Sequence, residues 1–217
     1  MENKIKNLQE PLSTNDIEFR VQSINKGGYA TILAYKNARV DMQRLDDVVG
    51  ALNWKREHTR DNANCIVSIR DDATGQWVSK EDTGTESSAE AKKGLASDSF
   101  KRACFNWGIG RELYDYPIIS AKLNSDEFDS SSGKAKQTWN LKLREWEWQV
   151  QFDKKTVTKI TAKDQNGKER YLFGKDTLTT NHENYDKVKS FIKGGGDIKE
   201  VEKKYILSDE IKKELNG

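Results

Sequence analysis

The segment from Gly84 to Gly110 constrains the fold most, because its sequence indicates one long helix with signals at both ends. Ser87 and Glu90 stand three residues apart, which is the spacing of a capping box at a helix N-terminus. Gly108 and Gly110 stand where such a helix would end. A helix of this length buries an apolar side, and the strand-like sequences before it predict that a sheet provides the partner surface.

The two sides of this predicted helix differ in chemistry. At about 3.6 residues per turn, the mostly apolar side comprises Lys92, Ala96, Phe100, Ala103 and Trp107, with Cys104 at its edge. Lys101, Arg102 and Phe105 fall on the opposite half. Ion pairs with Asp98 would make this half an ordinary solvated surface. An aromatic ring beside two cations also suits a polyanion with stackable bases, such as single-stranded nucleic acid.

The sequence before the helix predicts an α+β fold. The predicted elements, in order, are a hairpin over residues 17–36 turning at 25–28, a helix over 38–49, and strands over 54–58, 65–70 and 76–83. A β-hairpin and an antiparallel β-meander would therefore pack on the long α-helix, as a β-β-β-α core.

The second half of the chain predicts a loop, a further meander and a small helical module. Residues 125–137 are polar and Ser-rich, which is typical of a loop. Strands are expected over 138–150, 156–162 and 169–173, with a bulge near residues 144–145, as an addition to the first sheet. Residues 184–217 show helical spacing interrupted by three glycines. We therefore expect a core over 1–180 and a C-terminal helical module over 184–217.

Composition narrows the class of protein without identifying it. The 217 residues carry 33% charged side chains but a net charge of only +2, so a basic surface requires segregation of charge. Two Cys and two His would suffice in number for one four-ligand zinc site, but Cys65 lies in an apolar strand pattern and Cys104 in the helix, so we expect both to be buried hydrophobic side chains and not ligands. No apolar run is long enough to span a membrane, and the N-terminus lacks an apolar signal region. We expect an intracellular protein with no cofactor.

The usual catalytic motifs are missing from the sequence. It contains no phosphate-binding glycine-lysine loop, no dinucleotide fingerprint and no arguable Ser/His/Asp set. Four acidic residues could hold Mg²⁺ as in a nuclease, namely Asp71, Asp72, Glu81 and Asp82. Asp71 and Asp72 are better explained as turn residues, and the order of Lys80 and Glu81 differs from the common nuclease pattern. The sequence thus favours a non-enzymatic function.

Three runs of residues together resemble a known family. They are Val40–Gly50 followed by Asn53 and Trp54, Trp77–Asp82 followed by Gly84–Glu86, and Lys93–Ala103 followed by Trp107–Arg111, Leu113 and Tyr114. In this combination the chain is similar to the single-strand annealing proteins of the Rad fifty-two superfamily, above all to phage Sak-like and bacterial members. The likeness covers residues 17–117 well and the later meander loosely.

The resemblance implies a function and a set of site residues. It implies a ring or helical homo-oligomer that binds single-stranded DNA in an outer groove and anneals complementary strands without ATP. By position in the motif, Lys101 and Arg102 would contact phosphates, and Arg20 would contribute from the hairpin. The remaining candidates are Lys80, Lys92 and Lys93 as further DNA contacts or solvated side chains, Phe105 as a base or subunit contact, and Arg111 as a subunit contact.

The same resemblance implies a cellular process and compartment, and it leaves alternative functions open. We expect a protein of DNA recombination and repair in the cytoplasm of a bacterial host cell, of phage or bacterial origin. The C-terminal module could bind a host or phage replication or recombination protein or make a weak DNA contact, or it could be only a docked extension of the core. The alternatives are a DNA-end protector that binds single strands without annealing them, a metal-dependent nuclease, and a structural adaptor whose basic helix is only solvated.

Overall fold

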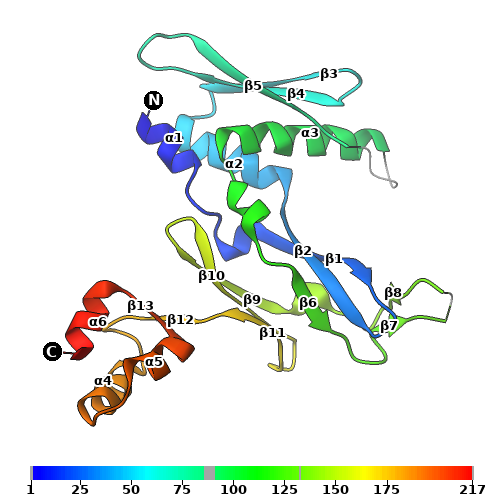
Figure 1. Cartoon of the computed structure of the whole chain (residues 1–217). Helices are drawn as coiled ribbons and strands as arrows, with labels where there is room; N and C mark the ends of the chain where they lie inside the picture. Colours follow the sequence, from blue (N-terminus) through cyan, green and yellow to red (C-terminus); the bar gives the residue numbers. More distant parts are fainter. Residues whose placement is uncertain (1, 86–90, 132, 217) are drawn as a thin grey trace. The chain divides into compact units, whose positions relative to one another are not determined.

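The computed structural model describes residues 2–85, 91–131 and 133–216, and for residues 91–93 and 216 it describes the backbone alone. The chain forms two compact units (Figure 1). Unit 1 comprises residues 1–144 with 154–156, and unit 2 comprises 145–153 with 157–217. Among the described residues, no helix is long and apolar enough to cross a membrane.

The predicted hairpin is present in unit 1 and gains a third strand. β1 (Ile17–Ile24) pairs antiparallel with β2 (Tyr29–Lys36), and β2 pairs antiparallel with β6 (Ile119–Lys122). Ahead of the hairpin lie α1 (Glu2–Leu8) and the short 3-10 helix η1 (Thr14–Asp16). One face of this sheet is buried, including Ala30, Ile32 and Ile119. The other face carries mostly polar and aromatic side chains, together with Leu33.

The predicted β-β-β-α core is confirmed. α2 (Ala38–Val49) leads into the antiparallel sheet β3 (Trp54–Thr59), β4 (Asn64–Arg70) and β5 (Trp77–Thr83), which lies across α3 (Ala91–Trp107) in Figure 1. The apolar side chains between these elements form one core, which comprises Leu8, Leu45, Val49, Cys65, Val67, Ile69, Phe100, Ala103, Cys104, Trp107 and Ile109. The fold class is α+β, as predicted.

α3 ends where predicted and buries most of the predicted side, but Ala96 is only half-buried, and Leu95 and Ser99 are buried although the spacing did not place them there. Phe100, Ala103 and Cys104 are fully buried, whereas Lys101 and Arg102 are partly exposed. Gly108 follows the helix with a φ of 96°, a conformation that L side chains rarely adopt, and its N–H donates to the carbonyl of Phe105. The predicted capping box of Ser87 and Glu90 lies outside the described residues.

The segment after α3 differs from its predicted strand pattern. It contains η2 (Arg111–Asp115), the short hairpin β7 (Phe128–Asp129) and β8 (Lys136–Gln137), and η3 (Leu143–Glu145). The strand predicted over 138–150 was wrong in its first half, because Thr138 and Asn140 instead bond to Asp126 and form a turn. Trp139 is 87% exposed on that turn. The predicted bulge at residues 144–145 is the 3-10 helix η3.

Unit 2 joins a small sheet to the C-terminal helices. Its sheet has the order β11 (Glu169–Gly174), β10 (Thr156–Lys163) and β9 (Glu147–Asp153), so the meander is a separate sheet and not an extension of the first. The remaining elements are β12 (Asp176–Leu178), α4 (Tyr185–Lys193), α5 (Ile198–Lys204), β13 (Tyr205–Leu207) and α6 (Asp209–Asn216). β12 and β13 form a parallel pair that the sequence did not predict.

The C-terminal helices have their own apolar core. It comprises Leu178, Tyr185, Val188, Val201, Ile211 and Leu215. The predicted cap of the last helix is present, since the Ser208 hydroxyl accepts from the N–H of Ile211 at 3.3 Å. The contacts group the β9–β11 sheet with these helices, whereas the sequence predicted a functional core over residues 1–180. Where the functional core ends stays a prediction.

Candidate nucleic-acid interface

Lys101 and Arg102 occupy neighbouring positions on α3 and reach different surroundings. Lys101 Nζ lies 3.8 Å from Asp98 Oδ1 on the same helix, and its side chain is 24% exposed. Arg102 Nε donates to Asp82 Oδ1 of β5 at 3.2 Å, and its side chain is 39% exposed. Among the described residues, each cation thus pairs with one carboxylate and remains accessible to water. Phosphate oxygens could therefore replace those carboxylates.

The C-terminal end of α3 gathers two further cations. Lys80 Nζ donates to the carbonyl of Asn106 at 2.6 Å and lies 4.6 Å from the centre of the Trp107 ring. The Arg111 guanidinium donates to the carbonyls of Phe105 and Asn106 at 2.8 to 3.1 Å. Partial desolvation lowers the pKa of Lys80, and the charge of Arg111 lowers it further. Both cations cap the helix, so a structural role accounts for their positions.

Phe105 lies over a buried ion pair. Lys36 and Asp41 are 1% and 0% exposed and bond to each other, and Lys36 Nζ also donates to the carbonyl of Ile109 at 2.5 Å. The ammonium lies 4.1 Å from the centre of the Phe105 ring, which also packs against Tyr114. Phe105 is thus half-buried within unit 1. Its contact with a base or a second subunit stays a prediction.

The exposed face of the first sheet carries a row of cations and aromatic rings. Arg20 of β1 lies 5.0 Å from the centre of the Tyr35 ring, and Tyr35 Oη donates to Glu18 at 2.5 Å. Lys122 of β6 is directly opposite Tyr29 of β2 and lies 4.7 Å from the centre of its ring. Because side chains on one face recur every second residue, both pairs share one face.

Sequence reasoning found Arg20 in this row but missed the three residues beside it. Tyr29, Tyr35 and Lys122 carry no motif, and Lys122 belongs to a strand far along the chain. The alternation of Tyr29, Thr31, Leu33 and Tyr35 against buried neighbours was the available signal. A row of cations and exposed aromatic rings is what proteins use to follow the backbone and bases of a single strand.

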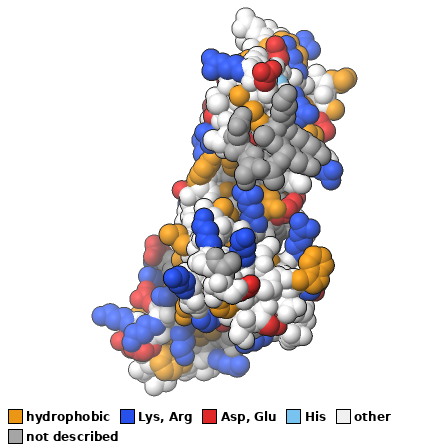
Figure 2. All heavy atoms as spheres, turned by 90° about the vertical axis from the view of Figure 1, so that its right-hand side faces the viewer, with side chains coloured by type: hydrophobic (Ala, Val, Ile, Leu, Met, Phe, Trp, Pro, Cys, Tyr) orange, Lys and Arg blue, Asp and Glu red, His pale blue; other side chains and the backbone are white. Residues whose placement is uncertain are grey.

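For Lys92 and Lys93, the remaining predicted cations, the structure describes the backbone alone. The backbones of Lys92 and Lys93 belong to the first turn of α3, and their side chains lie outside the described part of the chain. Figure 2 shows Lys and Arg side chains recurring over one face of the molecule, separated by acidic and apolar side chains. The cations in this view are thus dispersed, and the candidate interface rests on the individual contacts of Lys101, Arg102, Arg20 and Lys122.

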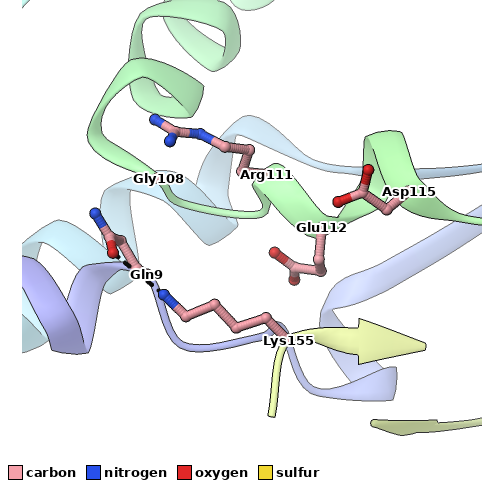
Figure 3. A pocket seen from close by; sticks show the side chains of 6 residues that line it. All are labelled: Gln9, Gly108, Arg111, Glu112, Asp115 and Lys155. Atoms are coloured by element: carbon pink, nitrogen blue, oxygen red, sulfur yellow. Dashed lines mark hydrogen bonds between the residues drawn. The ribbon is translucent and has the colours of Figure 1, made fainter. Parts of the chain in front are cut away.

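Most charged side chains that line a small pocket below the end of α3 bond to other groups of the protein. The pocket has a volume of about 140 Å³ and is lined by Gln9, Gly108, Arg111, Glu112, Asp115 and Lys155 (Figure 3). Arg111 bonds to the carbonyls of α3, Glu112 accepts from the N–H of Leu12 at 2.6 Å, and Lys155 bonds to Gln9 at 3.2 Å. These bonds account for three of its four charged side chains, all except Asp115, and we assign no ligand to this pocket.

The acidic residues considered for a metal site each have another partner. Asp71 accepts from Thr74 in its turn, and Asp72 pairs with Lys4 at 2.5 Å. Glu81 accepts from Asn64 at 2.5 Å, and Asp82 holds Arg102. Over the residues that the structure describes, no three His, Cys, Asp or Glu side chains gather as a metal site. The described geometry therefore gives no support to a metal-dependent nuclease.

The cations and aromatic rings of unit 1 indicate a class of protein. An α+β unit with paired cations on its long helix, and with cation–aromatic pairs on a sheet face, is typical of proteins that bind single-stranded nucleic acid. A family model described as Rad52/22 family double-strand break repair protein matches residues 2–132, more than half of the chain. The chain belongs to this family, which confirms the resemblance found in the sequence.

Two bacterial relatives each match about half of the chain. The single-stranded DNA-binding protein DdrA of Deinococcus radiodurans is 33% identical over 115 residues, which are 52% of this chain and 55% of the relative. The protein of the same name from Deinococcus deserti is 33% identical over 115 residues, which are 52% of this chain and 57% of the relative. This chain therefore spans about half the length of the curated relatives that it matches.

Proposed function

We propose that this protein binds single-stranded DNA and anneals complementary strands without ATP, as a ring or helical homo-oligomer acting in DNA repair and recombination. The membership of the Rad52/22 family supports a role in repair. The two relatives that are named single-stranded DNA-binding proteins support the ligand. The proposed function includes no covalent chemistry and no metal.

The observation that carries this proposal is the Lys101–Arg102 pair. The two side chains are adjacent in sequence and partly exposed, and within the part of the chain that the structure describes each pairs with a single carboxylate. A phosphodiester backbone offers charges at regular spacing, and phosphates neutralised by Lys and Arg release their counterions. The pair is therefore suited to holding consecutive phosphates of one strand, with Arg20 and Lys122 as additional contacts from the hairpin face.

Annealing makes a further physical demand on the site. The backbone must be held while the base edges remain free to pair, so contacts should go to phosphates and to the flat faces of bases. The candidate interface offers cations and aromatic rings, which make these two kinds of contact. Repetition of such a site around a homo-oligomer would hold one strand at many points, and so multiply a weak affinity per site.

One experiment separates this function from its alternatives. Two complementary labelled oligonucleotides are mixed with the protein in EDTA and without ATP, and duplex formation is followed by fluorescence. Pairing faster than in the protein-free control supports annealing. Binding without acceleration would show an end protector, strand cutting that needs Mg²⁺ would show a nuclease, and no binding at low salt would leave only an adaptor. Particle images with and without DNA test the ring or helical oligomer.

The ion pair between Arg102 and Asp82 predicts a gain of affinity on removing the acid. We expect Asp82→Asn to raise single-strand affinity about two- to fivefold, because exposed ion pairs contribute roughly 0.2–1 kcal/mol and the variant frees the guanidinium for phosphate. Fluorescence anisotropy with an oligothymidine measures the change. Glu57→Gln is the matched control, since Glu57 is an exposed acid on the same sheet. An affinity equal to that of the control variant would argue against Arg102 as a phosphate contact.

The hairpin face predicts a stacking contact at Tyr29, which is 47% exposed. Tyr29→Ala should weaken oligothymidine binding at least about fivefold, since stacking of a base on an aromatic ring contributes about 1–3 kcal/mol and every 1.4 kcal/mol is about a factor of ten. Tyr29→Phe keeps the ring and should bind like the wild type. Leu52→Ala removes a side chain that is 92% exposed elsewhere in unit 1 and serves as a control. If both Tyr29 variants bind like the wild type, this face is not part of the interface.

A further inference from the structure

The C-terminal helices form a groove that the DNA-binding surface does not explain. Residues of α4 and α5, together with Asn184 and Tyr205, line a hollow of about 400 Å³. Its apolar lining is provided by Val188 and Phe191 of α4, Val201 of α5 and Tyr205. Val188 and Val201 are buried, whereas Phe191 is 48% exposed. A half-exposed aromatic ring above a buried aliphatic floor is suited to receiving an apolar side chain from another molecule.

The glycine run between the two helices shapes this groove. A Cβ atom at Gly196 would lie 2.4 Å from a ring carbon of Phe191, so only glycine lets the ring occupy its position. Gly194 has a φ of −78°, and a Cβ there would make an ordinary contact of 3.4 Å with the Ser190 carbonyl. The two glycines thus differ in what they do: Gly196 places the Phe191 ring, and Gly194 does not.

The charges at the edge of the groove select the kind of partner. Lys187 and Lys204 line it, and within the described residues neither forms an ion pair. Glu200, the acidic residue in the lining, is paired with Lys203 at 2.5 Å. The edge is therefore positive around an apolar floor. An acidic segment with a bulky apolar side chain complements both properties, whereas a nucleic acid would leave the floor unused.

We propose that the groove between α4 and α5 binds an acidic protein segment, which inserts an apolar side chain against Phe191 and pairs its carboxylates with Lys187 and Lys204. The occupant is a segment of another protein, because the described part of this chain leaves the groove open. The groove and the Lys101–Arg102 pair belong to different compact units and share no residue. Binding of DNA and binding of the segment can therefore be tested separately on the same protein.

The test uses the full chain and a labelled synthetic peptide in which Phe and Leu lie one helical turn apart among Asp and Glu residues. We expect saturable binding that weakens with salt, and that falls at least about tenfold in the Lys187→Glu/Lys204→Glu variant. Gly196→Ala should weaken binding by displacing the Phe191 ring, whereas Gly194→Ala should bind like the wild type. Lys163→Glu/Lys168→Glu, at exposed positions away from the groove, is the control for charge reversal. Thermal unfolding shows that each variant remains folded.

Three results would overturn the proposal. They are no binding of the acidic peptide by the wild type, equal binding of a peptide with Lys in place of every acidic residue, and equal binding by the groove and control charge-reversal variants. If the groove variant loses oligothymidine binding instead, the groove is a nucleic-acid contact and not a peptide site. Unchanged oligothymidine affinity beside a lost peptide affinity supports the proposal whatever the fate of the annealing function.

Discussion

Replacing both cations of the α3 pair, as Lys101→Ala with Arg102→Ala, is expected to weaken binding of an oligothymidine roughly 30- to 100-fold at low salt. Each charge-assisted contact contributes about 1 to 1.5 kcal/mol, and every 1.4 kcal/mol is about a factor of ten. The slope of log affinity against log salt should also fall by about 1.4, since each phosphate contact contributes about 0.7 for a single strand. Anisotropy titrations at several salt concentrations measure both quantities.

The control for this experiment keeps the change in net charge and moves it elsewhere. Lys163→Ala with Lys168→Ala removes two exposed cations from unit 2, and it should change the affinity little. The α3 variant should retain its fold, because its two side chains are partly exposed and lie outside the core. Equal affinities of the two double variants would contradict the placement of the interface on α3.

The second large effect concerns the buried ion pair below Phe105. We expect Lys36→Met to reduce the free energy of unfolding by about 3 to 5 kcal/mol, because it leaves the Asp41 carboxylate buried without its cation. Lys36→Met with Asp41→Asn removes both charges, and its loss should be clearly smaller than the sum of the single losses. Urea unfolding of the wild type and the three variants measures these energies. A loss below about 1 kcal/mol for Lys36→Met would contradict the pairing.

The same pair predicts a dependence of stability on pH. Burial raises the pKa of Asp41 from 3.8 to about 6, and the Lys36 cation opposes that rise. A carboxyl with a raised pKa stabilises the folded state below its unfolded pKa, and this contribution is lost as the pH rises through about 6. Without Lys36 the pKa rises further, so the Lys36→Met loss should be larger at pH 8 than at pH 5. Asp41→Asn should lose this component of the pH dependence.

Much of unit 1 could be predicted from the sequence because its signals are local. The hairpin, α2, the three-stranded meander and α3 follow from alternation, helical spacing and glycine positions, and the structure confirms them. The Lys101–Arg102 pair could be found because helical spacing separates it from Phe100 and Ala103. Its carboxylate partner Asp82 could not, because that contact joins a strand to a helix.

The errors arose where tertiary contacts decide the structure. The alternation over residues 138–150 suggested one strand, but bonds from Thr138 and Asn140 to Asp126 hold the first half in a turn. Local sequence likewise does not decide which strands pair, so the prediction that the β9–β11 meander extends the first sheet was wrong. The row formed by Tyr29 and Lys122 was missed because β6 joins the hairpin from a distant part of the chain.

The parallel pair of β12 and β13 determines how the C-terminal helices are attached to the β9–β11 sheet. Asp176 lies opposite Tyr205, so the strand before α4 and the strand after α5 are joined by one short ladder of backbone hydrogen bonds. A partner seated between these helices would therefore be presented at a fixed reach from the β9–β11 sheet, and not at the end of a flexible tether. In a ring of such subunits, the fixed position of the groove, and not the length and flexibility of a linker, would determine the local concentration of the partner.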